Sequence, residues 1–234
     1  MMRVQNRIGI LGVLILCVPL VISSVSAGEV VLVTGFEPFG LYAPNPSQLI
    51  AESLNGTTVN DAEIIGIVLP VDFNESVKKA LHAIEQYHPD LVLSLGLAAR
   101  SNMVKIENIA VNLKRYPKDD GTWSFPKRID KNGPFLRFSS LPTREIARRI
   151  QKAGFPARQS VFAGTYICNA LFYGLGGYFK ENNMNTSYGF IHVPLLDSQG
   201  PNGIPLDTLV EAVTLAIDVS LEEHRLCRND VENE

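Results

Sequence analysis

The sequence predicts an α/β fold: a single domain with an open, twisted and mostly parallel sheet, flanked by helices on both faces. Apolar runs rich in β-branched residues alternate along the chain with longer amphipathic stretches, which is typical of strands joined by helical crossovers. No internal repeat or low-complexity linker divides the 234 residues. We therefore expect one domain over residues 28–230, long enough to bury a sizeable core.

The first elements alternate strand, helix, strand. EVVLVTGF at 29–36 predicts a buried strand that ends in a glycine turn. A short helix is expected at 46–56, because Asn45 is a natural N-cap and Pro46 suits the first helical position. The apolar run at 63–71 predicts the second strand.

The middle of the chain continues this order. Residues 74–90 have helical spacing and stop at Pro89, which cannot continue a helix. LVLSLGLA at 91–98 predicts a third strand that runs into small residues, and 106–112 predicts a shorter fourth strand.

The remaining elements complete the pattern. A helix is expected at 142–155, between a starting proline and a closing glycine. Strands are expected at 158–164 and 188–195, separated by a helix that contains Cys168, and a long amphipathic helix at 205–224 closes the domain.

The N-terminal residues 1–27 predict a secretory signal peptide. Arg3 and Arg7 precede an apolar run of 15 residues at 8–22, and small residues follow up to a cleavage position after Ala27. The alternative is an uncleaved membrane anchor, but the run is short for a bilayer span, which needs roughly 20 residues. We expect an exported protein, periplasmic or secreted, with no stable membrane insertion after cleavage.

Charge and composition exclude several functional classes. Loss of Arg3 and Arg7 reduces the 21 basic side chains to 19 against 24 acidic ones, a net charge of −5 with no basic cluster, so no nucleic-acid partner is expected. Only Cys168 and Cys227 remain after cleavage, too few for a disulfide framework. The four histidines are scattered, and we expect no metal.

Aromatic residues outside the expected strands have structural interpretations. Trp123 lies in a loop rich in Lys, Asp and Gly, which suits a packing lid or a contact with a partner. The run Phe172, Tyr173, Tyr178 and Phe179 suits either the core or a contact between subunits, so a monomer and a homo-oligomer both stay open.

The loops that follow strands are where an α/β fold gathers its active groups. Four such loops stand out: TGFEPFG, SLGLAAR, AGTYIC and HVPLLDSQG. They place Cys168 near the start of a helix, whose backbone N–H groups favour a thiolate, and His192 at the end of the next strand. Glu107 is a candidate to orient the imidazole. From the residues alone, a small buried Cys168 and a core His192 are favoured over a catalytic pair.

Four motifs together resemble the pyroglutamyl peptidase I family of cysteine exopeptidases. They cover the chain from about Val30 to Ala216, in the family's order: VLVTGFEPFG with NPS, GLAARSNMVKIENIAVN, GTYICNALFY and GFIHVPLLDSQ. The resemblance implies a Glu–Cys–His triad that falls on Glu107, Cys168 and His192. The spacing of 24 residues between Cys168 and His192 matches the family.

The resemblance also implies a pocket for the pyroglutamyl ring. Its two phenylalanines fall on Phe36 and Phe39, whose rings suit a flat, uncharged lactam. Asn45, the backbone of Leu97 and Arg115 match further positions of this substrate site.

Three departures from the family pattern lie near these motifs. Leu41 replaces a second glycine, and Asn108 replaces an arginine directly after the triad glutamate. The segment LKRYPKDDG is about two residues shorter than its counterpart, so the match of Arg115 depends on a gap. They put the rate and preference in doubt more than the reaction class.

The expected function is that of a cysteine exopeptidase, or omega peptidase, acting on peptides with N-terminal pyroglutamate and using no cofactor. The alternative is a non-catalytic exported relative that binds peptides or small amides in the same pocket. If the triad is real, the Cys168 sulfur should lie within about 4 Å of one ring nitrogen of His192. A carboxylate oxygen of Glu107 should reach the other nitrogen.

Overall fold

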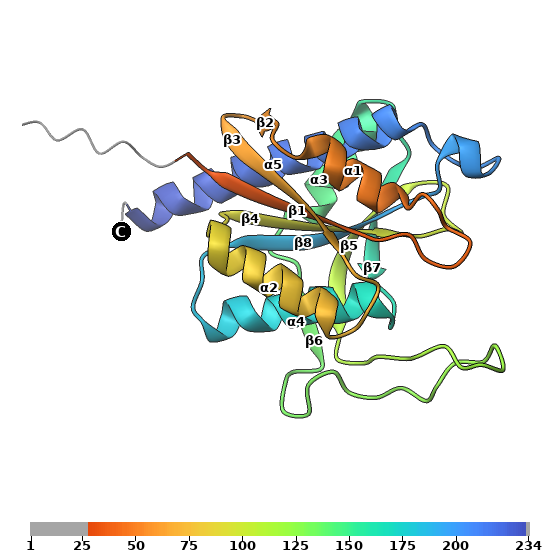
Figure 1. The fold of residues 1–234 in the computed structure, drawn as a ribbon. Coiled ribbons are helices and arrows are strands. Elements are labelled where there is room, and N and C mark those ends of the chain that lie inside the picture. The colour runs from red at the N-terminus through yellow and green to blue at the C-terminus, as the bar shows by residue number, and fades with distance from the viewer. Residues whose placement is uncertain (1–27, 233–234) are drawn as a thin grey trace, which may run out of the picture.

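A computed structural model describes residues 28–232, with side chains up to residue 228. The predicted signal peptide at 1–27 lies outside the described residues. Within these described residues, five α-helices pack against one eight-stranded sheet (Figure 1). The strands are β1 (Val30–Phe36), β2 (Thr58–Val59), β3 (Ala62–Leu69), β4 (Leu91–Leu97), β5 (Val104–Val111), β6 (Leu136–Phe138), β7 (Ala157–Phe162) and β8 (Ser187–Val193). The helices are α1 (Pro46–Leu54), α2 (Glu75–Tyr87), α3 (Thr143–Lys152), α4 (Ile167–Glu181), the 3₁₀ turn η1 (Asp197–Gln199) and α5 (Leu206–Glu232).

The sheet is mostly parallel, with an antiparallel margin. Its strand order is β2-β3-β1-β4-β8-β5-β6, and β7 pairs with β5 off this path. Strands β3, β1, β4 and β8 run parallel to one another, whereas β5 runs antiparallel to β8. Only residues 98–103 separate β4 from β5, too short a link for a parallel crossover, which needs a dozen residues or more.

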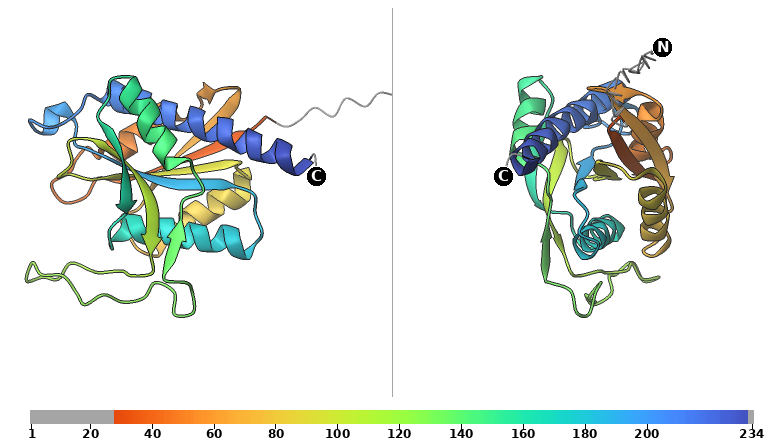
Figure 2. Two further views of the ribbon diagram at one scale, coloured as in Figure 1. Left: turned by 180° about the vertical axis from the view of Figure 1, so that it is seen from behind. Right: turned by 90° about the vertical axis from the view of Figure 1, so that its left-hand side faces the viewer.

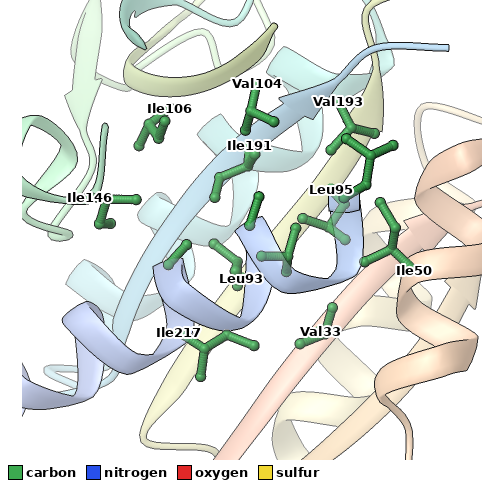
Figure 3. Packing of buried hydrophobic residues seen from close by; sticks show 14 of the residues in the cluster. Val33, Ile50, Leu93, Leu95, Val104, Ile106, Ile146, Ile191, Val193 and Ile217 are labelled. Carbon is green, nitrogen blue, oxygen red and sulfur yellow. The ribbon is translucent and has the colours of Figure 1, made fainter. Parts of the chain in front are cut away.

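Helices cover both faces of the sheet, as predicted. Helices α1, α3 and α5 lie on one face, and α2 and α4 lie on the other (Figures 1 and 2). Successive residues of a strand alternate between two buried clusters, so that Leu91, Leu93 and Leu95 face the first helix set and Val92 faces the second. Figure 3 shows part of the first cluster, where Leu93 and Ile191 of the central strands lie close to α5.

Local signals account for the helix boundaries. The Asn45 side chain caps α1 by accepting a hydrogen bond from the Ser47 N–H at 3.1 Å, with Pro46 at the first helical position. Helix α2 ends at His88, in a left-handed conformation directly before Pro89. Both boundaries follow the sequence prediction.

The expected order of strands and helices is confirmed, with two kinds of difference. The short elements β2, β6 and η1 were not predicted, and β5 starts two residues earlier than expected. Strand β7, which precedes Cys168, is parallel to β5 and therefore runs opposite to β8, a direction that the sequence did not indicate.

The aromatic run on α4 belongs to the core. Phe172, Tyr173 and Phe179 are each at most 3% exposed and lie in the second cluster, with Tyr178 packed against it. This confirms the core alternative for these residues. No helix within residues 28–232 is both long and apolar enough to cross a bilayer.

A long connection between β5 and β6 extends away from the sheet (Figure 1). Its residues 114–127 form a narrow two-stranded ribbon, here called the Trp123 ribbon. Backbone bonds close it: Lys114 and Lys127 exchange hydrogen bonds at 2.7 and 2.9 Å, and Ser124 donates to Tyr116 at 2.8 Å. The segment is therefore ordered by its own backbone pairing.

Candidate active site

Three of the predicted site residues project onto the same face of the sheet. His192 lies near the end of β8 and alternates with Ile191 and Val193, which face α5, so its ring faces α4. Glu107 lies on the neighbouring strand β5, where residue 105 pairs with His192. A long side chain reaches such a diagonal neighbour across two paired strands.

The expected hydrogen bond between Glu107 and His192 is present. Glu107 Oε1 lies 2.8 Å from His192 Nδ1, and the two side chains are 2% and 12% exposed. The other carboxylate oxygen, Oε2, is buried without a hydrogen-bond partner among the described residues. The buried carboxylate therefore has the His192 ring as its hydrogen-bond partner through Nδ1. The other ring nitrogen, Nε2, stays available to Cys168.

Cys168 reaches this site because α4 begins there. It is the second residue of the 15-residue helix, and its neighbour Asn169 is fully buried. The Asn169 amide accepts from Val111 N and donates to Val111 O and Leu113 O, all at 2.8–2.9 Å. These bonds fasten the first turn of α4 to the end of β5, the strand that carries Glu107.

The first turn of α4 keeps its backbone donors available. Among the described residues, no side chain caps the helix at Tyr166, and the first N–H bonded within the helix is that of Ala170, to Tyr166 O at 3.0 Å. Free N–H groups and the helix dipole both favour negative charge at this position. The turn suits a thiolate and a developing oxyanion.

The charges of the site favour a protonated His192. Burial opposes the charged ring, but the negative charge and hydrogen bond of Cys168, and then those of Glu107, raise its pKa to about 9. Burial and the charge of Cys168 also raise the pKa of the Tyr166 hydroxyl. A protonated imidazole beside Cys168 is the partner that a cysteine nucleophile needs.

A small cavity adjoins the cysteine. Four residues expected from the resemblance line it together with Cys168: Phe36, Phe39, Asn45 and Leu97. Val71, Tyr166 and Ile167 complete the lining. The aromatic walls and the cysteine therefore share one cavity, as the sequence predicted.

Different contacts hold the two phenylalanines. Phe36 ends β1 and is 3% exposed, and its N–H donates to Ser47 Oγ at 3.1 Å. Phe39 is half-buried in the following loop, with Tyr42 edge-on at 5.3 Å. Asn45 donates to Glu37 O at 3.0 Å, so the residue that caps α1 also supports the loop between the two rings.

Arg115 is not among the residues that line the cavity. Its Nε donates to Ser124 O at 2.9 Å across the Trp123 ribbon, and its N–H donates to Thr165 O at 2.8 Å. The arginine therefore holds the ribbon together and attaches it to the segment just before Cys168.

Two of the departures from the family pattern point away from the cavity. The Asn108 side chain lies 3.3 Å from Thr143 Oγ1, at the start of α3 on the opposite face of the sheet from Glu107. Leu41 is 97% exposed. Neither side chain contacts the triad residues.

Sequence reasoning missed three residues that shape the site. A Cβ on Gly96 would lie 2.8 Å from Cys168 Sγ and 2.8 Å from the Phe190 ring, so only glycine fits there. Phe190 packs on the His192 ring at 4.9 Å, and Tyr166 lines the cavity. Each lies inside a quoted motif, but a small or aromatic residue type alone does not indicate such a contact.

The geometry suits nucleophilic acyl chemistry. No group of three or more His, Cys, Asp or Glu side chains in the described part of the chain is arranged to hold a metal ion. A cysteine, a protonated imidazole and the backbone donors of the first turn of α4 converge beside an aromatic cavity. Such an arrangement can cleave an amide whose acyl part fills the cavity.

Comparisons with known proteins agree with this geometry. The family model described as pyroglutamyl peptidase matches residues 29–223. A pyrrolidone-carboxylate peptidase of Halalkalibacterium halodurans is 37% identical over 82% of this chain and 98% of its own length. A pyrrolidone-carboxylate peptidase 1 of Caldanaerobacter subterraneus is 38% identical over 81% of this chain and 96% of its own length.

Solved structures give the same grouping. Pyroglutamyl peptidase I of Bacillus amyloliquefaciens superposes with a TM-score of 0.78 at 31% identity, over 84% of this chain and 98% of that one. Pyrrolidone carboxyl peptidase of Thermococcus litoralis superposes with a TM-score of 0.77 at 32% identity, over 83% and 94% of the two chains.

Proposed function

The chain belongs to the pyroglutamyl peptidase family, and from this premise we infer that it is a cysteine peptidase that removes N-terminal pyroglutamate from peptides. The observation that carries the proposal is the alignment of Glu107, His192 and Cys168 beside a cavity with two phenylalanines. Without the aromatic cavity the triad would indicate only a cysteine hydrolase.

Cys168 is the nucleophile. Its thiolate adds to the carbonyl carbon between pyroglutamate and the next residue, forming a C–S bond while the carbonyl oxygen takes the negative charge. The free N–H groups of the first turn of α4 stabilise that oxygen. The C–N bond then breaks as the His192 imidazolium gives its proton to the leaving amine, and a thioester remains.

His192 and Glu107 complete the second half of the reaction. The neutral imidazole takes a proton from water, whose oxygen attacks the thioester carbonyl, and the C–S bond breaks. Pyroglutamate leaves, and the thiolate and imidazolium are restored. Glu107 orients the ring throughout through its 2.8 Å hydrogen bond to Nδ1.

The cavity selects the lactam ring. Phe36 and Phe39 present apolar rings to a flat group without charge, while backbone groups around Leu97 are left to read its amide. A free N-terminal glutamate or glutamine brings an ammonium group that such a wall solvates poorly.

A chromogenic pyroglutamyl amide tests this function directly. The wild-type protein should hydrolyse it, a thiol-alkylating reagent should stop the reaction, and Cys168→Ala should be inactive with an unchanged fold. Phe39→Ala should weaken transition-state binding by about 1–3 kcal/mol, which should appear as a lower kcat/KM. Activity that survives in Cys168→Ala would overturn the proposed nucleophile, and no turnover by the reduced wild-type protein would favour the non-catalytic alternative.

We further propose that the protein is exported after cleavage behind Ala27. The family match begins at residue 29, directly after the predicted signal peptide. Contacts of the described domain also begin there: Glu29 accepts from Arg225 Nε at 2.7 Å, and Val30 N donates to Asp90 at 3.0 Å. Cleavage after Ala27 would leave every one of these contacts intact.

Fractionation and N-terminal mass spectrometry test export. Protein outside the cytoplasm should begin at Gly28. Cytoplasmic protein that keeps Arg3 and Arg7, or membrane-bound protein with an intact N-terminus, would contradict the proposal. A homo-oligomer stays a prediction, which light scattering on the purified domain would check.

A further inference from the structure

The Trp123 ribbon is attached to the backbone next to the catalytic cysteine. Arg115 N donates to Thr165 O, three residues before Cys168, at 2.8 Å. At the base of the ribbon, Asn112 accepts from Ile129 N and Asp130 N, both at 2.9 Å, and donates to Asp130 O at 2.7 Å. A backbone hydrogen bond next to the site and the Asn112 side chain therefore hold the base of the ribbon in place.

Four aromatic rings continue from the cavity to the ribbon. Tyr166 lines the cavity with Cys168, and its ring meets Trp123 edge-on at 5.4 Å and Phe73 edge-on at 5.4 Å. Phe73 packs on Tyr116 at 4.6 Å. These rings, Phe73, Tyr116, Trp123 and Tyr166, are here called the aromatic cluster.

One side of the aromatic cluster is covered and another is open. The Lys114 ammonium lies 5.7 Å from the Phe73 ring and 5.8 Å from the Tyr116 ring. Trp123, although packed on Tyr166, is 45% exposed. An exposed indole packed on Tyr166, which lines the cavity with Cys168, offers apolar contact area that core packing does not use.

We propose that Trp123 and Tyr166 bind the side chain of the residue that follows pyroglutamate and give the enzyme a preference for large apolar or aromatic residues there. This inference rests on the proposed function. The pyroglutamyl ring occupies the cavity between Phe36 and Phe39, and the scissile carbonyl lies at Cys168. The leaving part of the peptide must therefore extend out of the cavity, and Tyr166 is the lining residue that connects the cavity to an exposed ring.

The chemistry of the aromatic cluster suits such a side chain. Aromatic pairs stabilise each other beyond the apolar area that they bury. A side chain packed on Trp123 is held in both the bound substrate and the transition state, so the gain should appear mainly in KM. A small residue at that position leaves the indole uncovered and gains nothing.

Paired substrates test the proposal. Pyroglutamyl-phenylalanine amide and pyroglutamyl-alanine amide differ only in the ring that Trp123 would contact. In wild-type protein, kcat/KM should be about 3- to 10-fold higher for the phenylalanine substrate. Trp123→Ala should remove that preference by raising KM for the phenylalanine substrate, with little change for the alanine one.

Two further variants serve as controls. Trp123→Phe keeps an aromatic face and should retain most of the preference. Phe125→Ala removes another aromatic ring of the same ribbon, one that is 86% exposed and not part of the aromatic cluster, and should leave both substrates unchanged.

The outcomes distinguish a failure of the inference about Trp123 from a failure of the proposed peptidase function. Equal losses on both substrates in Trp123→Ala would mean that the indole only positions Tyr166, and an unchanged ratio would mean that the peptide leaves elsewhere; either result overturns the inference while the proposed function stands. A wild-type protein that cleaves neither substrate would overturn the proposed function, and this inference with it.

Discussion

The two ends of strand β8 each hold a buried histidine beside a potential nucleophile, and their electrostatics are opposite. At the carboxyl end His192 faces Cys168 and bonds Glu107. At the amino end Ser187 Oγ lies 2.9 Å from Nδ1 of His224, which α5 contributes and which is 6% exposed. The pKa of His192 is raised to about 9, whereas the pKa of His224 is lowered.

The difference shows that the charged partners decide whether burial prevails at each ring. Burial opposes protonation of both rings. At His192 the effects of Cys168 and Glu107 both raise the pKa, whereas the charges around His224 nearly balance: Asp90 and Glu29 favour the protonated ring, and Arg228 and Arg225 oppose it. Ser187 contributes a neutral hydroxyl, so burial prevails at His224 and lowers its pKa.

The larger cavity does not lie at the reactive end of β8. The cavity beside His224 has a volume of about 360 Å³, against about 60 Å³ for the cavity beside Cys168. The smaller cavity is the one that Cys168 lines, next to the pair formed by Glu107 and His192. In this molecule, the active site is therefore better located from pairs of ionisable side chains than from cavity volume.

The largest effect that would sharpen this comparison is expected from Glu107→Gln. The amide keeps the shape but loses the charge, so the ring orientation weakens and the pKa of His192 should fall. We expect kcat/KM to drop by about 10²–10⁴-fold, by analogy with the orienting carboxylate of other triads.

Ser187→Ala is the matched control at the other end of β8. It removes the hydroxyl partner of His224 and should leave kcat/KM unchanged. Equal activity of Glu107→Gln and wild type would show that the carboxylate has no role in orienting His192.

A smaller effect is expected from Gly96→Ala. The new methyl would lie 2.8 Å from both Cys168 Sγ and the Phe190 ring, so the sulfur must move relative to His192. Displacements of this size cost on the order of 10–100-fold in kcat. Gly174→Ala is the control, because its Cβ would meet only Val77, at 3.4 Å, within a helix that favours alanine.

The Gly96 comparison is read from kinetics and thermal unfolding together. A fall in kcat with a melting temperature near that of wild type would place the effect at the sulfur. A fall in melting temperature without any loss of kcat would contradict the expected displacement.

The pH profile should reflect the ion pair at the carboxyl end of β8. His192 must be protonated to release the amine, and its pKa is about 9. Activity should therefore hold through neutral pH, fall to about half near pH 9 and continue to fall about tenfold per further pH unit. Activity that declines already between pH 6 and 7 would mean that the ring titrates at its ordinary value.

The sequence predicted the carboxyl end of β8 far better than the amino end. Apolar alternation and capping residues located the main elements, because those signals are local. Cys168, His192 and Glu107 were identified by motif, since the chemistry of a thiol protease requires those residue types. The contact between Ser187 and His224 joins a strand to the closing helix 37 residues later, and no local pattern encodes it.

The antiparallel margin of the sheet and the role of Arg115 were missed for similar reasons. The direction of β5 follows from the short link after β4, a signal that was present in the spacing of the two strands but was not used. The Arg115 guanidinium bonds Ser124 because the intervening residues fold back as a ribbon, which their mixed composition does not indicate. Long-range pairing decided both outcomes.

The smallest effect is expected from His224→Asn, at the inert end of β8. The substitution removes the imidazole and with it the hydrogen bond to Ser187. It should lower the free energy of unfolding by about 1 kcal/mol at pH 7 and leave kcat/KM unchanged.

The acid stability of the protein should also change. The pKa of His224 is lower in the folded protein, so the unfolded chain binds more protons than the folded one once the pH falls below about 6.5. Wild-type protein should therefore lose stability as the pH drops from 7 to 5, and part of that loss should disappear in His224→Asn. Urea unfolding at the two pH values measures the difference. An equal acid loss in both proteins would show that His224 does not titrate abnormally. A shifted alkaline limb of activity would show that the two ends of β8 are coupled.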